Sequence, residues 1–174
     1  MPRIRYSVAT SVDGYIAGPD GEFDWILPDP TLDFAALFAE FDTFLVGRRT
    51  FEIMRAPGSP PLPRGSRVFV FSRTLTNKVE GVTVLSEVSP AIVAEIKARA
   101  KRDIWLFGGG SLFCSLLEQG LVDTVELKVM PVLLGAGTPL LPRPAQRAVL
   151  NLTDHHVSES GIAYLNYSVV RKTV

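Results

Sequence analysis

The stretch Ile104-Trp105-Leu106-Phe107-Gly108-Gly109-Gly110-Ser111 decides the fold class. Its first four residues are apolar without alternation, which is typical of a strand buried on both faces. The glycines then open an amphipathic helical pattern that runs to Gly120, a residue type that often ends helices. A buried strand that passes directly into a helix indicates an α/β protein.

The same alternation of strand and helix continues on the amino-terminal side of this stretch. Residues 43–46 and 68–71 are two further continuous apolar runs, and residues 4–10 alternate in the manner of a strand. Apolar residues at helical spacing predict helices over 34–41 and 89–100, and in the second of these Ser89 is the expected N-cap.

The carboxyl-terminal third returns to strand patterns, which we place at 122–130, 148–156 and 163–171. Strands and helices that alternate and then close in an antiparallel portion predict an α/β fold with a mixed sheet. The chain has 174 residues with no internal repeat and no linker, so a single domain over 1–174 is expected.

The composition excludes several classes of partner. Lys plus Arg and Asp plus Glu both number 18, so no global charge attracts nucleic acid or an anionic membrane surface. A single cysteine, Cys114, rules out an internal disulfide, and nothing has the spacing of a metal site. The chain shows neither a signal-peptide pattern nor a membrane-span pattern, so a cytoplasmic protein is expected.

Small, hydroxylic and basic residues follow three of the apolar runs. Gly47-Arg48-Arg49-Thr50 follows the first, Ser72-Arg73 the second and Gly108-Gly109-Gly110-Ser111 the third. Ligands of open α/β sheets bind beyond the carboxyl ends of the strands, where backbone amides and helix starts favour anions. Taken singly, each glycine has an alternative role in a turn and each arginine as a solvated side chain. Taken together, they favour a dinucleotide.

Other nucleotide and hydrolase motifs are missing. Phe113 stands where a Rossmann fingerprint needs its third glycine, and no G-x-x-x-x-G-K-[ST] occurs. There is also no G-x-S-x-G elbow.

The ordered set of Ala9 to Ala17, Trp25, Gly47 to Glu52, Ser72-Arg73 and Gly108 to Leu112 resembles the dihydrofolate reductase superfamily. The run from Leu127 to Leu141 is more similar to the riboflavin-biosynthesis reductase branch, the RibD C-terminal type. The resemblance implies a central, mostly parallel mixed sheet of about eight strands with helices on both faces. It also implies NADPH as the cofactor.

Carried over by position, the resemblance assigns a set of residues to NADPH. Ala9 and Ile16 would contact the nicotinamide, and Arg73, with Arg49 beside it, favours NADPH over NADH because a 2′-phosphate needs cationic partners. The full cofactor-binding set is Ala9, Ile16, Gly47, Arg48, Arg49, Thr50, Ser72, Arg73, Gly108, Gly109, Gly110, Ser111 and Leu112.

The catalytic positions depart from true dihydrofolate reductases. Thr31 stands where those enzymes place a carboxylate, and Lys128 where they place a threonine, which argues against dihydrofolate as the substrate. Asp33 is our first candidate for positioning the proton, with Asp29 on the other side of Thr31. Lys128 would bind an anionic substrate group. The alternatives are a helix-starting carboxylate for Asp33 and a solvated lysine paired with Glu126 for Lys128.

These observations favour an NADPH-dependent reductase of a small heterocycle or a ribosylamino-pyrimidine, with 5-amino-6-(5-phosphoribosylamino)uracil as the precedent of the family. The alternatives are a dihydrofolate or pterin reductase and, from another class, a non-catalytic NADPH- or flavin-binding protein. Relatives in this branch are commonly dimers, so a homodimer is expected. His155 and His156 should point to opposite faces of one strand and form no shared site.

Overall fold

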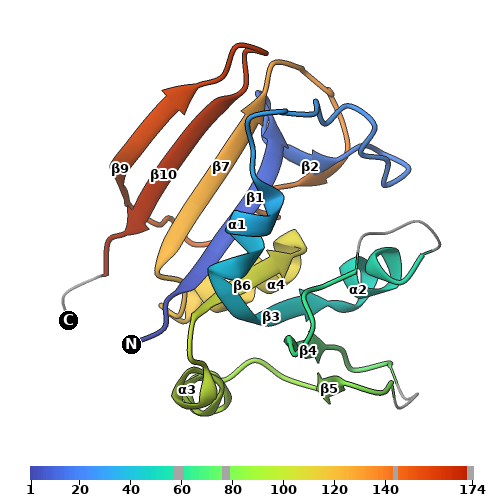
Figure 1. The fold of residues 1–174 in the computed structure, drawn as a ribbon, viewed down its shortest axis with the longest axis vertical. Helices are drawn as coiled ribbons and strands as arrows, with labels where there is room; N and C mark the ends of the chain where they lie inside the picture. The colour runs from blue at the N-terminus through green and yellow to red at the C-terminus, as the bar shows by residue number, and fades with distance from the viewer. Residues whose placement is uncertain (57–60, 76–78, 143–144, 172–174) are drawn as a thin grey trace.

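The structure is a computed structural model that describes residues 1–56, 61–75, 79–142 and 145–171. Its described residues form a central eight-stranded sheet (Figure 1). Its strands lie in the order β5-β4-β3-β6-β1-β7-β10-β9. Neighbours from β5 to β7 are parallel, whereas β10 runs antiparallel to both β7 and β9. The predicted mixed, mostly parallel sheet is therefore confirmed. The strands are β1 (Ile4–Ser11), β3 (Phe41–Gly47), β4 (Arg67–Phe71), β5 (Val82–Leu85), β6 (Asp103–Gly108), β7 (Thr124–Met130), β9 (Leu150–Val157) and β10 (Ala163–Val169).

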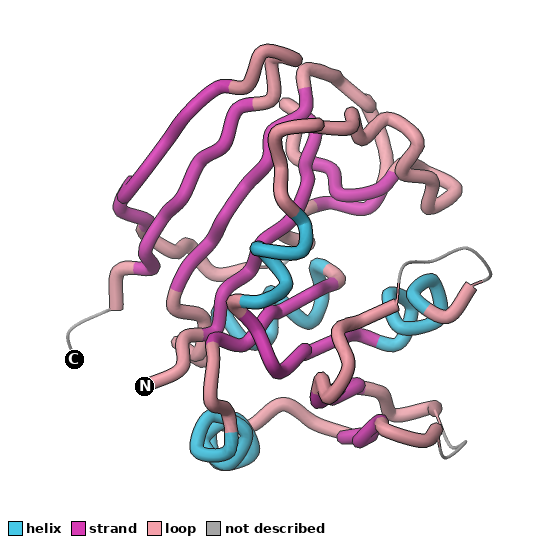
Figure 2. Tube along the Cα trace, viewed as in Figure 1, coloured by secondary structure: helices cyan, strands magenta, loops and turns pink. Residues whose placement is uncertain are grey.

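Helices cover both faces of the parallel part of the sheet (Figures 1 and 2). Helices α3 (Pro90–Arg99) and α4 (Gly110–Glu118) pack on one face, and α1 (Phe34–Ala39) and α2 (Arg48–Met54) on the other. A small ribbon of β2 (Tyr15–Ala17) and β8 (Thr138–Pro139) stands apart from the main sheet.

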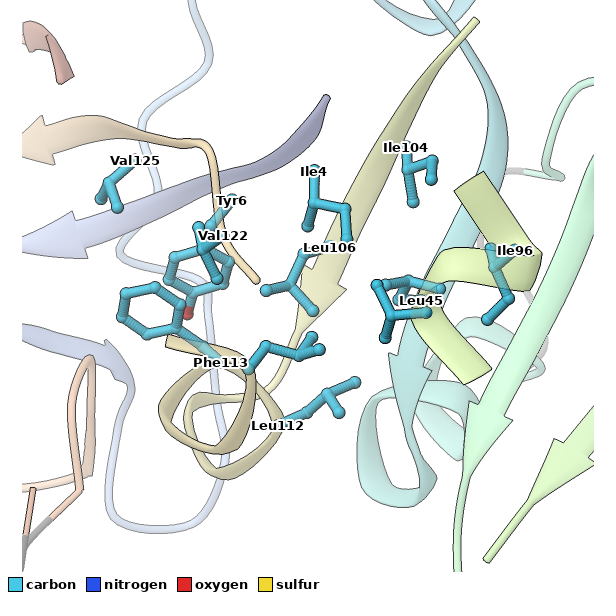
Figure 3. Packing of buried hydrophobic residues seen from close by; sticks show 12 residues of the cluster. Ile4, Tyr6, Leu45, Ile96, Ile104, Leu106, Leu112, Phe113, Val122 and Val125 are labelled. Atoms are coloured by element: carbon cyan, nitrogen blue, oxygen red, sulfur yellow. The ribbon is translucent and has the colours of Figure 1, made fainter. Parts of the chain in front are cut away.

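The face under α3 and α4 holds the larger hydrophobic core (Figure 3). Alternate residues of each strand point into it, because successive side chains of a strand face opposite ways. Tyr6 of β1 stacks on Phe113 of α4 with ring centroids 4.0 Å apart. Leu45 of β3 and Leu106 of β6 are fully buried beside them.

The opposite face, under α1 and α2, is packed with aromatic rings. Trp105 of β6 lies at its centre, with ring centroids 4.8 Å from Phe41 and 5.1 Å from Phe38. Its indole Nε1 donates to the backbone oxygen of Ser7 over 3.1 Å. Trp105 therefore joins β6 to β1 through a side chain.

The neighbouring strands β1 and β6 pair only near their amino ends. Ile4 lies opposite Ile104 and Arg5 opposite Trp105, where this ladder ends. On its other side β1 stays paired with β7 as far as Ser11 opposite Met130. The two parallel strands thus diverge toward their carboxyl ends, which is where ligands of such sheets bind.

The first helix is shorter than its pattern predicts. We expected a helix over 34–41, but α1 ends at Ala39, and Phe41 begins β3 with its ring in the aromatic core. Phe34 is left 57% exposed. Burial of Phe41 against Trp105 outweighs its fit to the helical spacing, because tertiary packing overrides weak local preference.

Some other boundaries and elements also differ from expectation. Residues 48–54 form the helix α2, whereas we had assigned the first of these residues only to phosphate binding. The strand β5 was not predicted. The three carboxyl-terminal strands are shifted or shortened, to 124–130, 150–157 and 163–169. The expected helix start at Ser89 is confirmed, since its hydroxyl accepts from the Ile92 amide over 3.3 Å.

Close backbone packing at the start of α4 generates the first prediction. A Cβ on Gly110 would lie 2.7 Å from the Pro139 carbonyl oxygen, and a Cβ on Gly47 would lie no nearer than 3.4 Å to its neighbours. We expect Gly110→Ala to lower the free energy of unfolding in urea by about 1–3 kcal/mol, because backbone must shift. Gly47→Ala should change it by less than about 0.5 kcal/mol. Equal stability of the two variants would contradict this packing.

Candidate functional site

The three predicted strand tips meet at one edge of the sheet. β3 lies between β4 and β6, with Gly47 opposite Phe71 and Val46 opposite Gly108. A Cβ on Gly47 would lie 3.4 Å from both the Gly108 oxygen and the Gly109 nitrogen, so the two backbones are in contact. The peptide bond between Gly108 and Gly109 is cis.

Thr50 and the start of α4 complete this edge. Thr50 Oγ1 lies 3.4 Å from where a Cβ of Gly109 would stand. The amides of Leu112 and Phe113 donate to the Gly109 oxygen, whereas those of Gly110 and Ser111 come before these bonds, at the open end of the helix. Backbone amides, a hydroxyl and glycines that carry no Cβ therefore share one edge of the sheet, and such groups can bind phosphates.

The predicted polar residues of this edge differ in what they contact. Arg48 pairs with Glu52 on the same helix over 2.7 Å, and the Ser72 hydroxyl accepts from the amides of Thr74 and Leu75. Arg49 and Arg73 are both exposed, and neither has an ion-pair partner within the residues that the structure describes. These two cations are the ones left available to an anion.

Ala9 and Ile16, assigned to the nicotinamide, lie toward the carboxyl end of β1 and just beyond it. Ala9 is on β1 and packs with Met130 and Tyr164, while Ile16 is on β2. Asp13, in the turn between them, binds the amides of Leu134 and Gly135 over 3.1 and 2.7 Å. This carboxylate joins the loop after β7 to the turn after β1.

A cleft of about 390 Å³ lies on the α1 side of the sheet, between α1 and strands β1, β7, β10 and β9. Its floor is formed by parts of two cross-strand rows. The members of these rows that line the cleft are Ser7, Glu126, Lys128, His156, Tyr164 and Asn166. Ala9, Lys128, Tyr164 and His156 are successive cross-strand partners in one row. The partners in the next row are Ser7, Glu126, Asn166 and Asp154.

Among the residues that the structure describes, no carboxylate forms an ion pair with Lys128. Its Nζ donates to Ser7 Oγ over 3.2 Å, whereas Glu126 receives two hydrogen bonds from Arg5, at 2.6 and 3.0 Å. The alternative in which Lys128 is a solvated lysine paired with Glu126 is therefore wrong, because β7 is an interior strand and Arg5 occupies the carboxylate. Burial lowers the pKa of Lys128, with Glu126 acting in the opposite direction.

Arg5 forms ion pairs with several of the acidic groups around the floor. Besides Glu126, it pairs with Glu40 at the end of α1, lies 3.5 Å from Asp103, and places its guanidinium 4.6 Å from the centre of the Phe41 ring. Burial disfavours its charge, but hydrogen bonds to Glu126 and Glu40 outweigh this and raise the pKa of Arg5.

The two candidate carboxylates occupy different places. Asp33 is the N-cap of α1, where its Oδ1 accepts from the Ala36 amide over 2.9 Å, and it is exposed outside the residues that line the cleft. Asp29 lines the cleft instead, and its Oδ2 accepts from the Tyr164 hydroxyl over 2.6 Å. Hydrogen bonds from Thr31 and Tyr164 lower the pKa of Asp29.

Sequence reasoning missed Ser7, Tyr164 and His156 as parts of this floor. The expected opposite orientation of the two histidines is confirmed, since His156 is paired with Tyr164 and His155 with Leu165. Alternating polar residues at 126 and 128 and at 164 and 166 were the available signal. Only the register between strands shows that they share a face.

Outside the cleft and the strand tips, three features of the described residues bear on function: the thiol, the metal-binding side-chain types and the length of the helices. Cys114 is buried, which raises its pKa, and the described residues contain no His, Cys, Asp or Glu cluster that would hold a metal ion. Among the same residues, no helix is both long and apolar enough to cross a lipid bilayer.

Comparison with known proteins agrees with this architecture. Residues 2–165 match the family model described as the RibD C-terminal domain. The uncharacterized protein YyaP of Bacillus subtilis is 32% identical over 95% of this chain and 94% of its own. The riboflavin biosynthesis protein RibD of Corynebacterium ammoniagenes is 26% identical over 82% of this chain and 47% of its own.

Solved structures show the same fold. A putative riboflavin biosynthesis protein from Shewanella sp. PV-4 has a TM-score of 0.81 at 28% identity and covers 98% of this chain and 100% of its own. Dihydrofolate reductase from Enterococcus faecalis, complexed with NADP(H), has a TM-score of 0.66 at 21% identity, covering 96% of each chain. Because the family model spans nearly the whole length of the chain, this chain belongs to the RibD C-terminal domain family, and it shares its fold with dihydrofolate reductase.

Proposed function

We propose that this protein is an NADPH-dependent reductase of a ribosylamino-pyrimidine or a related small heterocycle, similar to 5-amino-6-(5-phosphoribosylamino)uracil. The observation that carries the proposal is the adjacency of two features. One edge of the sheet is formed by the tips of β3, β4 and β6, and a cleft lined by the half-buried Lys128 begins at β1, the strand next to β6. Lys128 lines that cleft, and its cross-strand partner on β1 is Ala9.

The edge fits the cofactor. Gly47 and Gly109 carry no side chain at the point of backbone contact, so an anion can approach the amides closely. Arg49 and Arg73 supply positive charge, and Thr50 supplies a hydroxyl. Ala9 and Ile16 would lie against the nicotinamide ring. When bound, NADPH supplies a hydride to an electrophilic carbon.

The nitrogen or oxygen beside that carbon must then receive a proton. Lys128 has three N–H donors, of which Ser7 accepts one, so two remain for the cleft. Its lowered pKa makes the ammonium a stronger acid than an exposed lysine. We infer that Lys128, rather than Asp33, holds this proton and binds the heteroatom that becomes negative.

A combined binding and turnover assay tests the activity. We expect NADPH to bind and its absorbance to fall on addition of 5-amino-6-(5-phosphoribosylamino)uracil, with little or no fall on addition of dihydrofolate. Reduction of dihydrofolate instead would favour the pterin alternative. Tight NADPH binding without turnover of either compound would favour the non-catalytic alternative.

Arg73→Ala tests the position of the 2′-phosphate. Loss of a charge-assisted contact should raise the Kd for NADPH by about tenfold or more and change the Kd for NADH by less than about twofold. Quenching of protein fluorescence measures both values. Arg64→Ala, an exposed arginine at the opposite end of β4, is the matched control and should change neither affinity. Equal losses for both cofactors would place the 2′-phosphate elsewhere.

Asp33→Asn and Lys128→Met separate the two proton candidates. Asparagine caps helices as well as aspartate does, so Asp33→Asn should keep both the stability and kcat of the wild type. Lys128→Met removes the proton donor and should lower kcat by about 100-fold or more. Steady-state rates with saturating NADPH measure both. A large loss in Asp33→Asn with a small one in Lys128→Met would reverse the assignment.

The charged side chain of Lys128 should lower the stability of the folded protein, because it is partly removed from water. The pKa of Lys128 is lower in the folded chain than in the unfolded chain. At pH values between these two pKa values the unfolded chain binds more protons, so the stability of the wild type rises with pH in that range. At neutral pH we expect the free energy of unfolding of Lys128→Met in urea to exceed that of the wild type by about 1 kcal/mol. This difference in stability should become smaller toward about pH 10, near the pKa of lysine in the unfolded chain. Lys101→Met, at an exposed lysine, should show no such gain. A Lys128→Met variant less stable than the wild type at neutral pH would contradict this.

A further inference from the structure

Tyr164 joins two parts of the cleft that are far apart in the sequence. Its hydroxyl on β10 donates to Asp29, which lies in the segment before α1, over 2.6 Å. One side of its ring is stacked by His156, with centroids 4.3 Å apart and an angle of 8° between the planes. Trp25, from the same segment as Asp29, packs against the cluster of Met130, Ile162 and Tyr164. The segment is thus attached to the sheet at Tyr164.

The hydrogen bonds of Asp29 leave one acceptor site. Oδ1 accepts from both the amide and the hydroxyl of Thr31, at 2.8 and 2.6 Å, and Oδ2 accepts from Tyr164. An ionised carboxylate has about four lone-pair sites, so one site on Oδ2 remains. The pKa of Asp29 is lowered and that of Tyr164 is raised to about 12. Near neutral pH, the tyrosine is therefore the donor and the carboxylate the acceptor.

The Asp29 carboxylate, with its remaining acceptor site, and Lys128 both neighbour Tyr164. Tyr164 and Lys128 are direct cross-strand partners, and Asp29 is bound to the tyrosine hydroxyl. The cleft consequently offers N–H donors from Lys128 on its floor and one carboxylate acceptor at its rim. A ligand that satisfies both needs an oxygen or anionic group and, beside it, an amino or ring N–H group.

We propose that Tyr164 is a positioning residue that fixes the Asp29 carboxylate at the rim of the cleft, where it accepts an N–H donor of the substrate. This inference rests on the proposed reductase function, because it assigns the recognition of an amino-substituted heterocycle to the same cleft. His156 restrains the tyrosine ring by stacking. Lys128 acts on the reacting atoms, whereas Tyr164 acts through Asp29.

Tyr164→Phe removes the hydroxyl and keeps the ring, and Asp29→Asn removes the charge. Tyr167→Phe is the matched control, because Tyr167 lies on the opposite face of the same strand, paired with Val125. The double variant Tyr164→Phe with Asp29→Asn tests whether the two residues act as one unit. Calorimetric titration with 5-amino-6-(5-phosphoribosylamino)uracil gives the affinity without any need for turnover.

We expect Tyr164→Phe to raise the Kd of the pyrimidine by about three- to tenfold, with the double variant no weaker than Asp29→Asn alone. In turnover, KM should rise while kcat stays within about twofold, because the contact is present before and during the reaction. NADPH affinity should not change, and Tyr167→Phe should match the wild type throughout. Unchanged pyrimidine affinity in Tyr164→Phe, or full additivity in the double variant, would overturn the proposal.

Acrylamide quenching of tryptophan fluorescence gives a readout that is independent of substrate. Trp105 is 6% exposed, so quenching reports mainly Trp25, and Trp25→Phe verifies this. Release of the segment in Tyr164→Phe should raise the quenching constant above that of Tyr167→Phe, and equal constants would overturn the positioning role. Failure of the wild type to oxidise NADPH would count against the reductase function alone. Failure of the wild type to bind the pyrimidine would overturn the recognition role.

Discussion

The contact between the backbones of Gly47 and Gly108–Gly109 is the constraint on which the ligand-binding edge depends. Two parallel strands end there without side chains between them, and each passes at once into a helix, α2 or α4. Thr50 and the first amides of α4 reach the same edge because the two tips are adjacent. A side chain longer than a methyl group at either tip would occupy the space beside the amides that phosphates need.

The cleft depends on a second constraint, the register that joins β1, β7, β10 and β9. This register places polar residues of these strands side by side on one face. Arg5 pairs with Glu126 on this floor and with Glu40 at the end of α1, and Lys128 has the Ser7 hydroxyl as its hydrogen-bond partner. Desolvation of that ammonium disfavours folding, and such a cost is typical of sites selected for function.

The sequence predicts the fold better than it predicts the site. Runs such as 43–46 and 104–107 are buried on both faces, so their patterns alone identify the interior strands. The rows on the cleft floor depend on which residue of β7 lies opposite which residue of β10, and register is set by tertiary packing that a linear pattern does not contain. Phe41 shows the same limit, because its helical spacing is overruled by an aromatic core assembled from four elements.

Successive side chains of β7 and β10 point to opposite faces of the sheet. One face of each strand contributes to the core, and the other contributes to the cleft. Val125 and Tyr167 face the α4 side, while Glu126, Lys128, Tyr164 and Asn166 face the cleft. Substitutions at the cleft positions leave the interdigitated apolar layer untouched, so substrate preference can diverge among descendants of one ancestral scaffold without repacking it. A combinatorial library restricted to Glu126 and Asn166 would sample new selectivities while sparing Met130 and Tyr164, which pack in a buried cluster.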